Sequence, residues 1–123
     1  MSTLSLKQDI QAVYNLADRG MPLGELVDSI CGVLSRHETA LKGITYSYRL
    51  HAGDTGYTKA FALVDGRFAE LGYGDVADVT VSGKEEDLRR VFRREMSPMS
   101  ALLRGKIKVV GSKAGLMRLG EFL

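Results

Sequence analysis

The hydrophobic pattern of this chain changes its period near Gly43, and this change limits the fold more than any other feature. Before it, apolar residues recur every three or four positions, which is typical of amphipathic helices. After it, "ITYSYRLH" (44–51) alternates apolar and polar side chains, which is typical of a strand with one buried face. The chain therefore combines helices that need an apolar surface with strands that offer one, which predicts an α+β domain built on one sheet.

Two helices are expected before the change. The first runs from Leu6 to Arg19, with Gly20 placed to end it, and the second starts at Pro22, whose fixed φ suits a first helical position. Their apolar stripes consist of Leu6, Ile10, Val13, Tyr14 and Ala17, and of Leu23, Leu26, Val27, Ile30 and Leu34. We interpret the second stripe as core packing; for the first, contact with a membrane or a sister subunit stays open.

Turn signals divide the region after Gly43 into strands. "GDTG" (53–56) and Asp65-Gly66 separate three alternating segments, which predicts a three-stranded antiparallel meander. "DVADVTV" supplies a fourth strand and "KIKVV" a fifth, in which Ile107 and Val109 face inward.

Helices are expected on both sides of the fifth strand. Ser82 and Glu85 have the spacing of a capping box, which predicts the start of a helix. Ser97, followed by proline, starts a short helix that Gly105 ends. Ser112 is placed to cap a closing helix with an apolar side formed by Leu116, Leu119, Phe122 and Leu123.

Composition excludes several classes of protein. At 123 residues the chain has the size of a single domain, and its formal net charge of +2 is too small to require nucleic acid as a partner. Cys31 is the single cysteine, which excludes an internal disulfide and favours an intracellular protein. The sequence contains neither a signal-like N-terminal segment nor the roughly 18 consecutive apolar residues of a spanning helix, so we expect a cytoplasmic protein.

Candidate catalytic residues are few. His37 falls in line with the apolar stripe of the second helix, His51 lies on the polar face of its strand, and neither has an evident partner. No cation accompanies Cys31 on its helix to activate a thiolate. Glycine-rich phosphate loops and metal-ligand spacings are missing from the sequence, so we expect neither an enzyme nor a cofactor or metal.

Four arginines crowd the end of the helix expected after Ser82: Arg89, Arg90, Arg93 and Arg94. Acidic residues fill the first turn of that helix, so this order complements the helix dipole. Docking to acidic lipid headgroups is the functional alternative. Only Phe92 is interleaved among the arginines, which does not favour RNA binding.

The C-terminal stretch "MSPMSALLRGKIKVVGSKAGLMRL" resembles the sterol carrier protein 2 family of non-specific lipid-transfer proteins in its Pro, Ala, Gly-Lys, Val-Gly and Gly-Leu-Met landmarks. "ADVTVSGKEEDLRRVF" resembles the strand and capped helix of the same family, and the resemblance extends from about Leu26 to Leu123. It implies a five-stranded mixed, mostly antiparallel sheet covered by helices, enclosing an apolar tunnel for fatty acyl chains, sterols or other lipids. The lining positions it implies are Phe92, Met96, Met99, Leu102, Leu103, Ile107, Val109, Leu116, Met117 and Leu119.

The chain is thus expected to form one domain over residues 1–123, with residues 1–20 as a helical extension that serves docking, dimerisation or completion of the tunnel. The ending Glu121-Phe122-Leu123 differs from the peroxisomal tripeptide of animal members, so the resemblance does not imply a peroxisome. We expect a non-catalytic lipid-binding or lipid-transfer protein that contacts anionic membranes transiently. The alternative is an interaction module that dimerises or presents a lipid-like intermediate to a biosynthetic enzyme.

Overall fold

The computed structural model describes residues 3–17, 21–72 and 74–121, without the side chains of residues 3–5, 16, 17 and 119. The helices and strands of these residues follow the predicted order. They are α1 (Thr3–Ala17), α2 (Leu23–Arg36), β1 (Tyr46–Ala52), β2 (Thr58–Val64), β3 (Arg67–Glu70), β4 (Val79–Gly83), α3 (Glu85–Phe92), α4 (Pro98–Leu103), β5 (Ile107–Gly111) and α5 (Lys113–Gly120). Arg19, Gly20, Phe122 and Leu123 lie outside the described residues, and so does the side chain of Leu119.

The five strands form one sheet in the order β3-β2-β1-β4-β5. β1 pairs antiparallel with β2, and β2 with β3, which confirms the predicted meander. β4 lies parallel to β1 on its other side, and β5 pairs antiparallel with β4. The sheet is therefore mixed and mostly antiparallel, as the resemblance implies.

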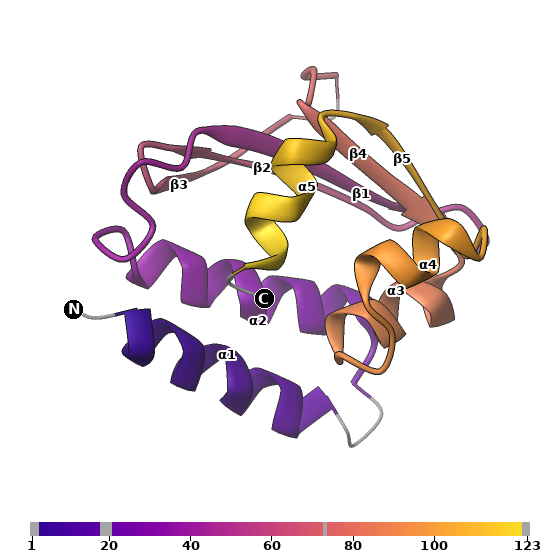
Figure 1. Ribbon diagram of the computed structural model, residues 1–123, viewed down its shortest axis with the longest axis horizontal. Coiled ribbons are helices and arrows are strands. Elements are labelled where there is room, and N and C mark those ends of the chain that lie inside the picture. Colours follow the sequence, from indigo (N-terminus) through magenta and orange to yellow (C-terminus); the bar gives the residue numbers. More distant parts are fainter. Residues whose placement is uncertain (1–2, 18–20, 73, 122–123) are drawn as a thin grey trace.

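The helices cover one face of this sheet. Figure 1 shows the sheet as one layer with α1 to α4 beneath it, and α5 descending from the sheet toward α2. The hydrophobic core lies between the two layers because the apolar stripes of the helices meet the inward face of the strands there. The largest fully buried apolar side chains are Leu6, Ile10, Leu23, Leu26, Val33, Leu34, Leu41, Ile44, Leu63, Leu88 and Ile107.

The start of α3 differs from the prediction. The capping box is wrong, because β4 continues through Ser82 to Gly83, which pairs with Ile107. The residue before the helix is Lys84, whose side chain makes no capping bond. Instead, the Glu85 N–H donates to Asp54 Oδ1 at 2.9 Å, so the cap comes from the turn between β1 and β2.

The local signals around α4 and α5 are confirmed. Ser97 Oγ accepts from the Ser100 N–H at 3.1 Å, and Ser112 Oγ accepts from the Gly115 N–H at 3.0 Å. Gly105 follows α4 with a φ of +71°, a conformation that glycine adopts without strain. Both helices therefore begin where a serine can satisfy a free backbone N–H.

Candidate functional site

A cavity of about 500 Å³ lies between the sheet and the helices. This volume is within the range of pockets that bind one small ligand, about 300–1,000 Å³. The sheet contributes Tyr48, Leu50, Phe61, Val81 and Ile107 to its wall, and the helices contribute Val27, Ile30, Cys31, Leu88, Val91, Phe92 and Leu116. Because this part of the wall is almost entirely apolar, it suits a ligand with a long apolar part.

Only some of the residues predicted to line the tunnel lie on the wall of this cavity. Phe92, Met96, Ile107 and Leu116 lie on its wall. Leu102 and Val109 are partly buried and pack against the core but not on the cavity wall. Leu119 cannot be placed, because its side chain lies outside the described residues.

Three other residues of the predicted lining point to the surface. Leu103 is 82% exposed, Met117 55% and Met99 45%. In α4, Met99 and Leu103 share one helix face because they are four positions apart, while Ala101 on another face is fully buried. The short helix α4 therefore turns Ala101 inward and Met99 and Leu103 outward, and neither these two residues nor Met117 of α5 lies on the cavity wall.

Several wall residues come from segments that the predicted lining omitted. α1 contributes Lys7, Gln11 and Tyr14, and β1 and β2 contribute Tyr48 and Phe61. Tyr14 belongs to the apolar stripe of the first helix, and Tyr48 and Phe61 lie in the predicted strands, whereas Lys7 and Gln11 lie outside that stripe. The lining was inferred from the region where the resemblance is most specific, which begins after the meander.

The opening of the cavity is recognisable from wall residues that are also exposed to solvent. Such residues are Lys7 and Gln11 of α1, Arg94 and Ser97 between α3 and α4, and Glu121 after α5. Gly120 of α5 is also exposed on the wall, and the buried Tyr14 lies beside Arg94. The term mouth is used below for Lys7, Gln11, Tyr14, Arg94, Ser97, Gly120 and Glu121.

At the mouth, the guanidinium carbon of Arg94 lies 5.1 Å from the centroid of the Tyr14 ring. This distance is within the range of a cation–π interaction. Burial raises the pKa of the Tyr14 hydroxyl above its ordinary value, and the neighbouring Arg94 opposes the shift. Tyr14 is therefore a neutral hydroxyl at physiological pH.

The four arginines do not form one open patch. Arg90 is exposed and lies 3.3 Å from Glu86, whereas Arg89 and Arg93 are partly buried and Arg93 lies 3.5 Å from Glu95. Arg94 is exposed and lines the mouth of the cavity. Arg90 and Arg94 are thus the two members of the cluster that face solvent.

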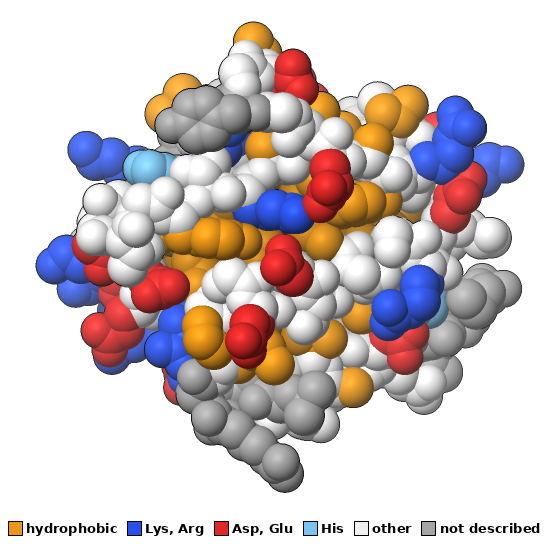
Figure 2. Space-filling view, turned by 180° about the vertical axis from the view of Figure 1, so that it is seen from behind, with side chains coloured by type: hydrophobic (Ala, Val, Ile, Leu, Met, Phe, Trp, Pro, Cys, Tyr) orange, Lys and Arg blue, Asp and Glu red, His pale blue; other side chains and the backbone are white. Residues whose placement is uncertain are grey.

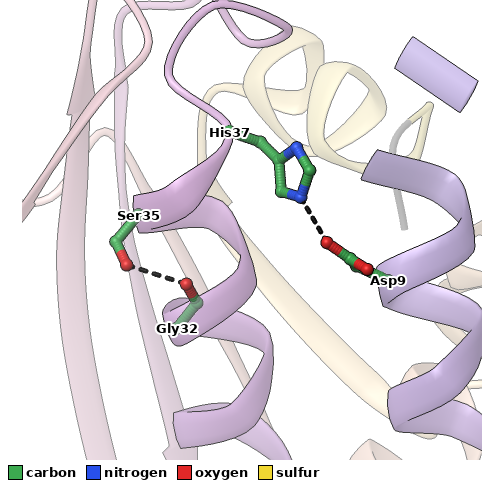
Figure 3. A network of polar contacts seen from close by, with 4 residues as sticks. All are labelled: Asp9, Gly32, Ser35 and His37. Carbon is green, nitrogen blue, oxygen red and sulfur yellow. Dashed lines mark hydrogen bonds and ion pairs between the residues drawn. The ribbon is translucent and has the colours of Figure 1, made fainter. Parts of the chain in front are cut away.

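His37 has a partner that the sequence did not reveal. Its side chain is only 2% exposed, and its Nε2 lies 2.5 Å from Oδ2 of Asp9 in α1 (Figure 3). The neighbouring Ser35 hydroxyl donates to the Gly32 carbonyl instead of approaching the imidazole. The pair joins α1 to the end of α2, and neither residue lines the cavity.

Cys31 and His51 have structural surroundings that account for them. Cys31 is buried on the cavity wall, and burial raises the pKa of its thiol to about 12. A thiol with such a pKa is a weak nucleophile at neutral pH. His51 Nδ1 lies 2.8 Å from the Thr58 hydroxyl across the β1–β2 pair.

The side of the molecule opposite to that of Figure 1 has a band of hydrophobic side chains with acidic and basic side chains lying over it (Figure 2). Lys59 of β2 forms two ion pairs: its Nζ lies 2.5 Å from Glu70 of the neighbouring β3 and 3.6 Å from Asp28 of α2, so the second pair joins the sheet to α2. Glu70 raises the pKa of Lys59, and Lys59 lowers that of Glu70.

Within residues 3–17, 21–72 and 74–121, no group of three or more His, Cys, Asp or Glu residues is arranged to hold a metal ion. None of the helices in the described part of the chain has both the length and the apolar character needed to cross a bilayer.

Residues 34–123 match the SCP-2 sterol transfer family, so the match begins near the end of α2 and includes the whole sheet. α1 and most of α2 precede it. No curated protein matches the chain.

Solved structures share this fold at low sequence identity. The sec-alkylsulfatase Pisa1 from Pseudomonas sp. is 20% identical, with a TM-score of 0.63 over 79% of this chain and 15% of that chain. This chain thus spans only about 15% of the length of that sulfatase. Palmitated SCP2L2 from Aedes aegypti is 18% identical, with a TM-score of 0.61 over 82% and 93% of the two chains. The ubiquinone synthesis protein UbiJ-SCP2 is 16% identical, with a TM-score of 0.58 over 81% and 90%.

Proposed function

The chain belongs to the SCP-2 sterol transfer family, and we propose that it binds one apolar lipid chain inside the cavity and carries it between membranes. The observation that supports this most is the apolar wall, formed jointly by the sheet and the helices around about 500 Å³. The palmitated Aedes protein of the same fold supports an acyl chain as the ligand.

The energetics suit a carrier. Burial of a methylene group is favourable by about 0.8 kcal/mol, so a sixteen-carbon chain gains on the order of 13 kcal/mol when it leaves water. A donor bilayer solvates the same chain about equally well, so exchange with a bilayer is nearly balanced. We therefore expect opening of the cavity, rather than affinity, to set the rate of transfer.

A substitution on the cavity wall tests the proposal. Val81 of β4 lines the cavity, whereas Val110 of the neighbouring β5 is 69% exposed. Val81→Phe adds a ring to the cavity, so the affinity for a fluorescent fatty acid should fall about tenfold or more, while the circular dichroism spectrum stays native. Val110→Phe is the matched control and should bind like the parent. Equal affinity of the three proteins would show that the ligand lies elsewhere.

A non-catalytic role is part of the proposal. It is supported by the unreactive thiol of Cys31 and by the position of His37 away from the cavity wall. Hydrolysis of a bound acyl ester at a rate that Cys31→Ala or His37→Gln abolishes would contradict this role.

We also propose contact with anionic membranes through Arg90 and Arg94, with Arg89 and Arg93 adding to the local positive potential. A basic residue near an anionic bilayer contributes roughly 1 kcal/mol, and salt screens this attraction. Transfer to acidic vesicles should therefore slow at high ionic strength. Equal transfer rates to neutral and acidic vesicles would contradict the proposed contact with anionic membranes.

The alternative function is presentation of a lipid-like intermediate to a biosynthetic enzyme, by a monomer or a homodimer. Its support is the shared fold with UbiJ-SCP2, a ubiquinone synthesis protein. Native mass spectrometry of the protein from its own host separates the two functions. A monomer with heterogeneous lipid adducts favours the carrier, and a dimer without lipid favours the presenting module.

A further inference from the structure

One helix near the mouth turns large apolar side chains toward solvent. Leu103 of α4 is 82% exposed, and Met99, four positions earlier on the same side of the helix, is 45% exposed. Among the described residues, the only other large apolar side chain exposed on a helix is Met117 of α5. Apolar side chains gathered on one exposed surface indicate an interaction site. Met99 and Leu103 are called the α4 face below.

The α4 face is not needed to hold α4 in place. Ala101, on another side of the helix, is fully buried, and Leu102 packs against the core. The Gly105 N–H donates to the Leu102 carbonyl at 3.1 Å, which closes the last turn of the helix. α4 therefore presents its exposed face on a preformed element, so contact with a partner does not require ordering of this segment.

The α4 face lies next to the mouth of the cavity. Ser97 and Pro98, at the start of the helix, are on the cavity wall, and Met99 follows them directly. Figure 1 shows α4 beside α3, at one side of the helical layer. A surface that contacts α4 therefore lies close to the opening of the cavity.

Basic residues flank the α4 face. Arg94 precedes the helix, Arg104 and Lys106 follow it, and all three are exposed. Glu95 is the one acidic residue between positions 94 and 106, and it lies 3.5 Å from Arg93. The surroundings of the α4 face are thus positive, which complements an anionic surface. An apolar face flanked by basic residues is typical of segments that lie in the interface of an anionic bilayer.

The apolar stripe of α1 is not available for such a contact. Leu6, Ile10, Val13 and Tyr14 are all buried and belong to the hydrophobic core. The contact of this stripe with a membrane, which the sequence left open, is therefore excluded for these four residues in the folded protein. Of the two helices, only α4 offers large apolar side chains to a bilayer.

We propose that α4 docks the protein on anionic membranes by inserting Met99 and Leu103 among the lipid acyl chains. Arg94, Arg104 and Lys106 then lie at the level of the lipid phosphates. This inference rests on the proposed function, because a carrier must meet a bilayer to load and release its lipid. It adds an apolar contact and an orientation to the electrostatic contact proposed above. In this orientation the mouth lies near the bilayer, which shortens the path of the acyl chain through water.

Sedimentation with vesicles of phosphatidylcholine and phosphatidylglycerol tests the α4 face. Leu103→Ser should lower the partition coefficient about tenfold, because transfer of a leucine side chain out of water contributes at least this factor. Val110→Ser is the matched control, since Val110 is exposed on the sheet face away from the helices, and it should partition like the parent. In about 1 M salt, where the Debye length falls to about 3 Å, the difference between the parent and Leu103→Ser should persist.

A fluorescence experiment tests the depth of insertion. The chain contains no tryptophan, so Leu103→Trp and Val110→Trp each introduce a single reporter. With vesicles whose acyl chains carry bromine, the emission of Leu103→Trp should shift to shorter wavelength and be quenched. Val110→Trp should show neither change.

The outcomes separate this proposal from the proposed function. Equal vesicle binding of the parent and Leu103→Ser, or no quenching of Leu103→Trp, would show that α4 does not insert. A parent dimer that Leu103→Ser converts into monomers would assign the α4 face to a second copy of the chain and overturn the proposal. Leu103 is not on the cavity wall, so Leu103→Ser should bind a fluorescent fatty acid like the parent. Failure of the parent itself to bind that fatty acid would contradict the proposed function, whereas the vesicle results decide the role of α4.

Discussion

Gly115 has no side chain, which allows α5 to pack closely against the sheet. A Cβ atom added there would lie 2.8 Å from a ring carbon of Tyr46 and 2.8 Å from a methyl carbon of Val79. The carbonyl of the same residue accepts a hydrogen bond from the buried Tyr48 hydroxyl at 2.8 Å. The first half of α5 is therefore held against the sheet at Gly115, by close packing and by a buried hydrogen bond.

Gly115→Ala should destabilise the fold. Both neighbours are buried or packed in the sheet, so the extra methyl forces a shift that costs about 1–3 kcal/mol, more than the roughly 0.5–1 kcal/mol that alanine gains over glycine within a helix. Gly120 is the control in the same helix, because its added Cβ meets nothing within 4 Å. Urea unfolding should show a lower midpoint for Gly115→Ala and an unchanged or higher one for Gly120→Ala; equal midpoints would contradict this packing.

Single residues were predictable where their partners are close in the sequence. Ser97 and Ser112 cap their helices as expected, because a cap acts over three residues. The partners of Glu85 and His37 are Asp54 and Asp9, which lie 31 and 28 positions away. Such pairs depend on the packing of whole elements, so no local spacing signals them.

At the scale of elements, α5 combines an anchored half and a half at the mouth. Gly115 and Leu116 pack against the sheet and the cavity, whereas Met117 is half exposed and Gly120 lies on the wall at the mouth. Segments with few buried apolar contacts open at low free energy. The second half of α5 is therefore the part of the helix best suited to admit a ligand.

Hydrogen exchange tests this division. With saturating fatty acid, the amides of residues 117–121 should gain protection of about tenfold or more, because ligand contact opposes local opening. The amides of β3, which does not line the cavity, are the internal control and should change little. Equal protection of residues 117–121 in empty and loaded protein would show that α5 does not gate the cavity.

The contribution of elements to the cavity was harder to predict than their existence. The helical period predicted α1 and its buried stripe, yet its position on the cavity wall follows only from its packing beside α2. In α4 the family resemblance implied lining positions at Met99 and Leu103, whereas the phase of this six-residue helix directs both side chains outward. Composition does not fix the rotation of a short helix about its axis.

At the scale of the molecule, the sheet and the helices together form the wall of the cavity. The meander was predictable from turn chemistry, since each hairpin joins neighbours in the sequence. The family resemblance implied a mixed sheet but not that β1 and β4 are the parallel pair, because the period of a strand does not specify a distant partner. The site follows from this pairing, which places Leu50 beside Val81 on the wall.

The most direct test of the account asks which side chains touch the lipid. In an isotope-filtered NOE experiment with ¹³C-labelled palmitate, ligand methylenes should show contacts to the methyl groups of Val81, Leu88 and Ile107, all on the cavity wall. The exposed methyl groups of Leu103 and Val110 should show none. Contacts confined to Leu103 and Val110, with none to the wall, would place the lipid on the surface and contradict the claim that this cavity holds it.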